Sequence, residues 1–186
     1  GINTLGTATT ATRNVSVGIA AAFSITTGGS NTTMGYVAGS NITTGSNNTI
    51  LGNEAQPSSA TVSNEIVLGN SSVSTLRCQT QTISSLSDAR DKTNIVDIED
   101  GLDLINLLKP RKFTWAMREP SANDGKTELG FIAQELDDVL GNKNDYIHAV
   151  SHSNPDKLEA AYGRFIPILV KAVQELSVKV TALEAG

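Results

Sequence analysis

Glycine returns every 17 residues through the first part of this chain, at positions 1, 18, 35, 52 and 69. The segments that end at the last four of these glycines read NVSVG, NTTMG, NNTILG and NEIVLG. They are rich in β-branched residues, as strands are, and small polar residues typical of turns follow each of them. One such unit has too few apolar side chains to bury a face alone, so the repeat predicts units that stack on one another.

The apolar side chains are few even for a stack. With roughly one or two sizeable apolar residues per strand, an ordering cost of about 1–2 kcal/mol per residue is hard to offset within one chain. We therefore infer that several chains share one core, as a β-solenoid or as intertwined β-structure. The other interpretation, a disordered linker rich in Gly, Ser, Thr and Asn, leaves the constant period unexplained.

Charge changes abruptly near Ser87. The charged residues before it are Arg13, Glu54, Glu65 and Arg77, and all others follow it. The net charge of −5, without a run of Lys and Arg, argues against nucleic acid and anionic lipid as partners. No stretch approaches the ~20 apolar residues of a membrane-spanning helix, and GINTLGTATT has no signal-peptide pattern. We expect a soluble chain without membrane insertion, and the lone Cys78 excludes an intrachain disulfide.

The second half predicts a small mixed α/β domain. VDIEDGLDLINLLKP reads as a helix that Asp97 or Asp100 caps and Pro110 ends, with an apolar stripe at Leu102, Ile105 and Leu108. RKFTWAM and ELGFI read as strands, and AQELDDVLG as a short amphipathic helix closed by Gly141. DYIHAVS is a further strand candidate.

The last segment, GRFIPILVKAVQELSVKVTALE, places apolar residues at alternating spacings of three and four. This pattern predicts a coiled-coil helix that joins copies of the chain. The other interpretation is an amphipathic helix packed on its own domain. The seam residues, here called the α-seam, are Ile166, Leu169, Val173, Leu176, Val180 and Leu183.

Few residues suggest chemistry. His148 and His152 are the only histidines and have no metal-ligand partners in sequence, so we expect no metal and no cofactor. Serine can act as a nucleophile when a neutral lysine takes its proton, and Ser87 and Lys92 are candidates for that pair. Five positions apart, they face different sides of a regular helix or strand, so a turn or a neighbouring chain must bring them together. Taken alone, a capping serine and a solvated lysine are the simpler interpretation.

The surrounding motifs favour the pair. SDARDKTNI, an acidic segment ending in LKP, FTW, LGFIAQEL and YGRFIPILVKAVQEL follow one another from residue 86 onward. In this order they resemble the endosialidase-type intramolecular chaperone family of self-cleaving peptidase domains. Residues that match the family pattern are Ser87, Asp88, Arg90, Lys92, Asn94 and Ile95. Asp91 replaces a usual apolar residue, and a carboxylate beside the lysine would favour its charged form and slow cleavage.

The resemblance implies the C-terminal region of a phage tail fibre or spike. Residues 1–86 would be a trimeric β-repeat stalk, since the repeat also resembles trimeric adhesin heads and tail fibres, and residues 87–186 the chaperone. In this α+β arrangement the chaperone assembles a homotrimer, with its own stalk as client, and is released by single-turnover self-cleavage. The protein would be assembled in the host cytoplasm and reside in the virion, with a host glycan or receptor as a further candidate partner.

The position of the cut stays open. Within one chain, attack by Ser87 on the carbonyl of Leu86 forms a five-membered ring, which favours the Leu86–Ser87 bond. Attack from another chain would also allow the Ser87–Asp88 bond. Arg90 and Asn94 are candidate supporting residues. A different class of function is a non-cleaving structural or receptor-binding module, whereas a membrane-tethered transcription factor with the same domain lacks support, because no DNA-binding or membrane segment is present.

Overall fold

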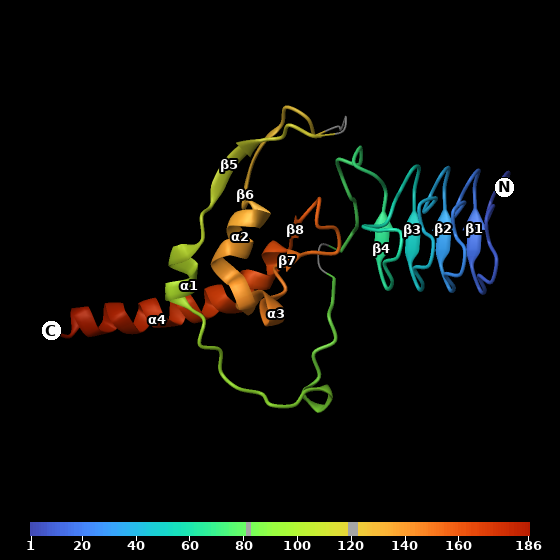
Figure 1. Ribbon diagram of the computed structural model, residues 1–186. Helices are drawn as coiled ribbons and strands as arrows, with labels where there is room; N and C mark the ends of the chain where they lie inside the picture. Colours follow the sequence, from blue (N-terminus) through green and yellow to red (C-terminus); the bar gives the residue numbers. More distant parts are fainter. Residues whose placement is uncertain (81–82, 119–122) are drawn as a thin grey trace. The chain divides into compact units, whose positions relative to one another are not determined.

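The computed structural model describes residues 1–80, 83–118 and 123–186, and the chain divides into two compact units. The first comprises Gly1–Leu76, Thr114–Lys126 and Ser153–Asp156. The second comprises Arg77–Phe113, Thr127–His152 and Lys157–Gly186. Short strands in a row dominate the first unit, and helices dominate the second (Figure 1). No helix in the described part of the chain is long and apolar enough to cross a membrane.

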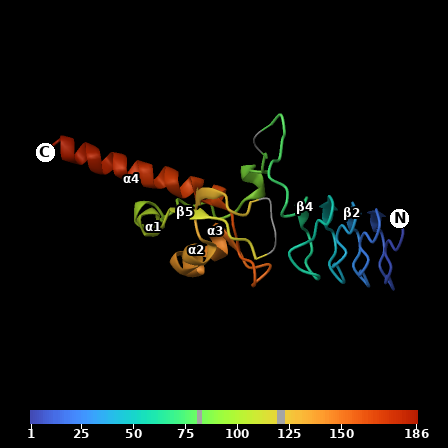
Figure 2. The same ribbon diagram turned by 90° about the horizontal axis from the view of Figure 1, so that it is seen from above.

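Four short strands form one parallel sheet in the first unit, in the order of the sequence. They are β1 (Val15–Val17), β2 (Thr32–Met34), β3 (Thr49–Leu51) and β4 (Ile66–Leu68). Each strand residue pairs with the residue 17 positions further on, as Ser16 does with Thr33. The units of the repeat therefore stack as successive coils, which Figures 1 and 2 show from two directions.

Close approach between coils explains why glycine recurs. A Cβ on Gly18 would lie 2.2 Å from the carbonyl oxygen of Gly35, and a Cβ on Gly35 would lie 2.3 Å from that of Gly52. Gly18 and Gly35 also have φ values of 132° and 140°, which side chains other than hydrogen rarely permit. Any larger residue at these positions would push neighbouring coils apart.

The interior of the stack is narrow and partly polar. Its apolar core consists of Ala22, Ile25, Ala38, Ile42, Ile50 and Ala55. Beside it runs a line of asparagines that precede the strands, here called the asparagine ladder: Asn14, Asn31 and Asn48. The backbone N–H of Asn31 donates to Asn14 Oδ1 at 2.8 Å, and that of Asn48 donates to Asn31 Oδ1 at 3.0 Å. Asn31 and Asn48 are fully buried, so these bonds satisfy groups that water cannot reach.

Glu65 ends the ladder, because it occupies the next position of the repeat. Its backbone N–H still donates to Asn48 Oδ1 at 2.9 Å. Its carboxylate instead accepts bonds from the N–H and the hydroxyl of Ser58, at 3.1 and 3.2 Å.

The second unit is mixed α/β, as the sequence indicates. A single turn of 3-10 helix, η1 (Ala89–Asp91), precedes the helices. The helices are α1 (Leu102–Leu107), α2 (Ala133–Leu140), α3 (Asn144–Ile147) and α4 (Ile166–Glu184), with 3-10 turns η2 (Gly141–Lys143) and η3 (Tyr162–Phe165). The strands form two pairs, β5 (Arg111–Thr114) with β6 (Thr127–Gly130) and β7 (Val150–Ser151) with β8 (Glu159–Ala160).

One apolar cluster holds these elements together. Its buried members are Leu104, Leu136, Leu140, Ile147, Ala149, Val150, Phe165 and Ile168. The members come from α1, α2, α3, β7, η3 and α4, so each of these elements contributes at least one side chain. Burial of a Leu or Ile side chain stabilises a fold by about 1.5–3 kcal/mol, which makes this cluster the main reason why the unit can fold as one body.

Two sequence expectations about this unit are wrong. Asp97 and Asp100 do not cap α1: Gly101 is its N-cap residue, and Glu175 of α4 accepts a bond from the N–H of Leu102 at 2.8 Å. The DYIHAVS segment is not one strand, because its first part is α3 and only Val150–Ser151 is extended. His148 turns the chain between them with a φ of 54°.

Helix α4 has two apolar faces. Ile168 and Ala172 are buried and belong to the side that faces the rest of the unit, where α4 contacts α1. The α-seam lies elsewhere on the helix, and its six side chains are 45–82% exposed. Packing on the helix's own domain therefore accounts for Ile168 and Ala172 but not for the α-seam.

Candidate functional site

The candidate nucleophile Ser87 lies on an exposed segment of the second unit. All described residues from 83 to 99 are exposed, including Leu86, whose side chain is 98% exposed. Ile95 and Val96, further along the segment, are 70% and 82% exposed. Apolar side chains of this kind gain free energy when they are covered, so the segment combines a polar site with unburied apolar flanks.

A tight turn brings the two candidate catalytic residues together. The 3-10 turn η1 occupies the positions between Ser87 and Lys92, and Lys92 ends it with its backbone N–H bound to the carbonyl of Ala89 at 3.2 Å. Lys92 Nζ donates to Ser87 Oγ at 2.6 Å and lies 3.3 Å from the Ser87 carbonyl oxygen. The spacing required either a turn or a neighbouring chain, and in this structure a turn joins the pair within a single chain.

Asp88 and Arg90 form this turn. Asp88 caps η1 by accepting a bond from the N–H of Arg90 at 2.9 Å. The guanidinium of Arg90 folds back on the same carboxylate, with Nε 3.0 Å from Oδ1 and a terminal nitrogen 2.6 Å from Oδ2. These side-chain bonds first, and the backbone bond second, lower the pKa of Asp88. The pair is here called the Asp88–Arg90 clamp. It favours the charged form of the Asp88 carboxylate, and both carboxylate oxygens are bonded to the Arg90 side chain.

The other residues of the motif lie around the turn. Asp91 is the last residue of η1 and is exposed. Asn94 follows with a φ of 53°, a left-handed conformation that asparagine tolerates better than most residues. This backbone requirement is a structural reason for asparagine at position 94.

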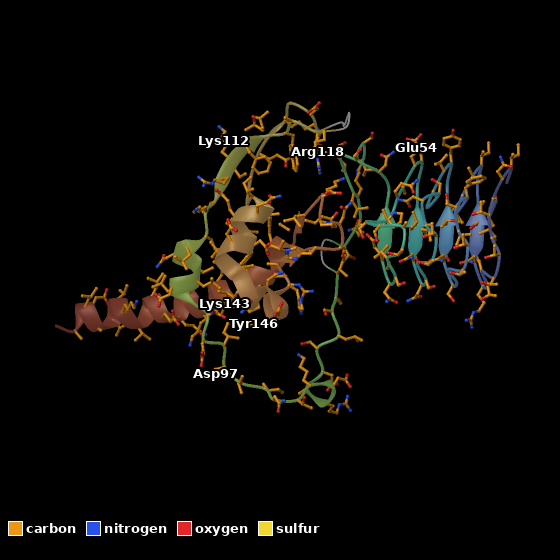
Figure 3. The ribbon with its side chains drawn as sticks, in the orientation of Figure 1. Glu54, Asp97, Lys112, Arg118, Lys143 and Tyr146 are labelled. Atoms are coloured by element: carbon orange, nitrogen blue, oxygen red, sulfur yellow. The ribbon has the colours of Figure 1, made fainter. Side chains whose placement is uncertain are left out.

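A polar anchor fixes the far end of the exposed segment. Asp100 Oδ2 accepts a bond from the Tyr146 hydroxyl at 2.6 Å, and Lys143 Nζ pairs with the other carboxylate oxygen. Figure 3 shows Lys143 and Tyr146 close together at α3, with Asp97 further out on the segment. The bond from Lys143, and then that from Tyr146, lowers the pKa of Asp100. Sequence reasoning missed this anchor, because nothing local to Asp100 points to partners more than 40 residues away.

The two histidines lie more than 60 positions from Ser87 in the sequence. His152 Nε2 is 3.0 Å from Asp137 Oδ2 on the surface of α2, and no contact of His148 with Ser87 is found among the described residues. Within residues 1–80, 83–118 and 123–186, no group of three or more His, Cys, Asp or Glu side chains could hold a metal ion. The geometry thus singles out Ser87 with Lys92.

Comparison with known proteins gives a family match for part of the second half of the chain. Residues 87–144 match the family model described as chaperone of endosialidase. A curated relative, the uncharacterized protein VP1 of Micromonas pusilla reovirus, is 48% identical over 60 residues, which are 31% of this chain. The matched region covers 3% of that relative's length. No solved structure matches the chain. The family match begins at Ser87 itself, the residue that the turn brings to Lys92.

Proposed function

Because residues 87–144 form an endosialidase-chaperone-type domain, we propose that the chain is the C-terminal region of a phage tail fibre or spike. In this proposal residues 87–186 bring three chains together, fold the repeat stalk of residues 1–86, and are then released by self-cleavage at Ser87. The observation that carries the cleavage step is the contact of 2.6 Å between Lys92 Nζ and Ser87 Oγ.

The chemistry needs one nucleophile, one base and water. Neutral Lys92 takes the proton of Ser87 Oγ while Oγ attacks the carbonyl carbon of Leu86. The Leu86–Ser87 carbon–nitrogen bond breaks, the lysine returns the proton to the Ser87 nitrogen, and an ester joins Leu86 to Oγ. Water then attacks the ester carbon. As the carbon–oxygen bond breaks, one water proton passes to Ser87 Oγ, which regains its hydroxyl, and the other is released to solvent as Leu86 leaves as a carboxylate. Attack from another chain would leave the Ser87–Asp88 bond as the alternative.

Exposure supports control of this reaction by assembly. In the single chain Lys92 acts as a hydrogen-bond donor to Ser87 and faces water, whereas a general base must offer a lone pair. Desolvation favours the neutral form of lysine. Covering the segment with neighbouring chains would bury Leu86 and Ile95 and withdraw water from Lys92 in the same event. Cleavage would then follow assembly and not precede it.

The α-seam supports contacts between copies of the chain. Its residues are exposed along the whole of α4, while Ile168 and Ala172 serve the contact with the helix's own unit. Leu and β-branched residues at this spacing pack as knobs into holes between helices. Residues such as Val173, which is 63% exposed, would be covered when the helices of three chains associate.

The stack carries a second apolar surface with the same implication. Outward-facing apolar residues recur at one equivalent position in all four strands, so they form a stripe along the sheet. The stripe consists of Val17, Met34, the half-buried Leu51 and Leu68, and the exposed Val15 and Ile66 lie beside its two ends. A partner that contacts every coil must have the same period, and another copy of the stack has it. The stripe thus favours a core shared between chains, in accord with the small interior of each stack.

The chaperone would act mainly on the kinetics of folding. Parallel pairing over a 17-residue separation gives nonlocal contacts, whose loops must close before the contacts form. Association of the α4 helices would hold three chains in register and raise their local concentration. After release, the stalk would lack the domain that guided its assembly and would be trapped kinetically. The virion, with a host glycan or receptor as ligand of the stalk, is the proposed setting.

The experiment is denaturing gel electrophoresis of freshly expressed protein. We expect two fragments of about half length, which Ser87→Ala and Lys92→Ala abolish. Ser85→Ala and Lys112→Ala are matched controls at exposed sites and should cleave as the wild type does. Mass spectrometry of the fragments identifies the broken bond. An intact wild-type chain would contradict self-cleavage and favour the non-cleaving structural or receptor-binding module. The carboxylate of Asp91 next to Lys92 supports this alternative, because it favours the charged form of the lysine.

Light scattering tests the assembly step separately. The Ser87→Ala chain should have the mass of three copies, and Val173→Asp, which puts a charge in the α-seam, should reduce it to one copy. The same substitution in the Ser87-containing chain should prevent cleavage, because the site would stay exposed to water. A monomeric Ser87→Ala chain would refute the trimer, and cleavage by a Val173→Asp monomer would refute control by assembly.

A further inference from the structure

We propose that the Asp88–Arg90 clamp positions Lys92 for its role as a base. The clamp shapes the turn that brings Lys92 to Ser87, and it also offsets the negative charge of the Asp88 carboxylate near the lysine. This inference rests on the proposed self-cleavage. It assigns to Asp88 and Arg90 roles that are distinct from those of the nucleophile and the base, since neither touches Ser87 Oγ.

The first role is geometric. Lys92 reaches Ser87 Oγ only because η1 reverses the chain between them. The bond from Arg90 N–H to Asp88 Oδ1, 2.9 Å long, fixes the start of that turn. Turns in which an aspartate or asparagine oxygen binds the backbone two residues on are stable local structures. An asparagine at position 88 could make the same bond, because its amide oxygen is also an acceptor.

The second role is electrostatic. The charged side chains of the segment close to Lys92 are Asp88, Arg90 and Asp91, and the residues around them are exposed. A free carboxylate near a lysine favours its charged form, which cannot accept the serine proton. Asp88 is adjacent to the nucleophile, yet Arg90 occupies both of its oxygens at 3.0 and 2.6 Å. The bidentate pair orients the carboxylate toward Arg90 and offsets its charge.

The two roles predict different responses to pH. Arg90→Ala would leave the capping oxygen in place but free the carboxylate, so Lys92 would hold its proton more strongly. Cleavage would then reach half of its maximal rate at higher pH. An opposite charge nearby shifts such a midpoint by about one pH unit, which slows cleavage about tenfold at a fixed pH below it. Asp88→Ala would lose the capping bond and slow cleavage at every pH without raising the midpoint.

The decisive variant removes both charges and keeps the cap. Asp88→Asn combined with Arg90→Ala should return the midpoint to within about 0.3 pH unit of the wild type. Asp91→Asn is the matched control on the same turn. Because Asp91 is a carboxylate outside the clamp, its removal should move the midpoint to lower pH and speed cleavage. A clamp with only a structural role would give slow cleavage and an unchanged midpoint in Arg90→Ala.

The experiment uses the full chain recovered unfolded from inclusion bodies, where it has neither assembled nor cleaved, and refolded between about pH 6 and about pH 11, a range that includes the reference pKa of lysine, ~10.4. Cleavage is followed by gel electrophoresis against time. Each variant is also made with Ser87→Ala, and light scattering of that protein at each pH corrects for differences in assembly.

The outcomes separate this inference from the proposed function. A raised midpoint for Arg90→Ala that Asp88→Asn reverses supports the clamp. An unchanged midpoint, or a shift that the double variant keeps, overturns the clamp while leaving self-cleavage intact. A wild-type chain that assembles but does not cleave overturns the proposed function itself, and the clamp with it.

Discussion

Asn31 is the residue of the stack whose removal should be most damaging. Its side chain is 1% exposed and lies in the middle of the asparagine ladder. Nδ2 donates to Asn14 Oδ1 at 3.1 Å and to the carbonyl of Gly45 at 2.9 Å. Oδ1 accepts bonds from the backbone N–H and from the side-chain amide of Asn48, both at 3.0 Å. Asn31→Ala removes all four bonds at once.

The cost follows from the groups that are left behind. The N–H of Asn48 and the carbonyl of Gly45 would stay buried without a partner, and each such group costs about 1–3 kcal/mol. We therefore expect a loss of about 4 kcal/mol in the free energy of unfolding of the stack, which is a large part of the 5–15 kcal/mol typical of a domain. A free-energy difference of this size lowers local protection by about a thousandfold.

Hydrogen exchange followed by mass spectrometry measures this effect in the uncleaved Ser87→Ala chain. Amides of residues 48–51 should lose most of their protection in Asn31→Ala. Asn41→Ala is the matched control, because Asn41 is exposed and bonds to Gln56 through its backbone N–H. It should change stability by less than about 0.5 kcal/mol. Equal protection in the two variants would refute the reasoning that the ladder stabilises the stack.

Two further predictions concern the second unit. A Cβ in Gly101→Ala would lie 2.6 Å from both carboxylate oxygens of Glu175 and displace them from the start of α1, so thermal unfolding should show a loss of about 1 kcal/mol in the free energy of unfolding. Gly163 has open space around it, so Gly163→Ala is the control and should leave the stability unchanged. An equal loss in both variants would refute the capping role of Glu175. The bond from Lys143 lowers the pKa of Asp100 below its ordinary value of 3.8 in the folded protein. The charged Asp100 therefore contributes its full stabilisation of the fold above pH 3.8, and this contribution is lost as the pH falls through the lowered pKa of the folded state. Asp100→Asn should remove this part of the acid dependence in urea unfolding, and an unchanged profile would contradict it.

The periodic features of the chain were accessible from the sequence, because they repeat. The glycine period equals the register of the parallel sheet, and Gly18 shows why glycine is required at the contact between coils. The helical pattern of the last segment likewise corresponds to α4. The spacing of Ser87 and Lys92 was informative too: it required either a turn or a neighbouring chain, and η1 provides the turn.

Features that depend on partners far away in the chain could not be predicted from the sequence. The acidic residues before α1 resemble helix caps, but Asp100 binds Lys143 and Tyr146, while Glu175 takes the capping position from 73 residues away. Local propensity does not reveal which of several carboxylates lies closest in space. The asparagine ladder was also missed, although Asn14, Asn31 and Asn48 share the glycine period, because asparagine ordinarily indicates turns and not a buried position.

The fixed register of the stack has a consequence for how such chains diversify. Each repeat adds one coil, and neighbouring strands of a sheet lie about 4.8 Å apart. Gain or loss of a whole unit of 17 residues would change the length of the stack by that step and keep every column of side chains aligned. An insertion of another size that does not bulge out as a loop would shift the later residues out of the 17-residue register, and the close approach of Gly35 to Gly52 leaves no room for a side chain there. Duplication of whole repeats can therefore adjust the length of the stack in discrete steps of one coil.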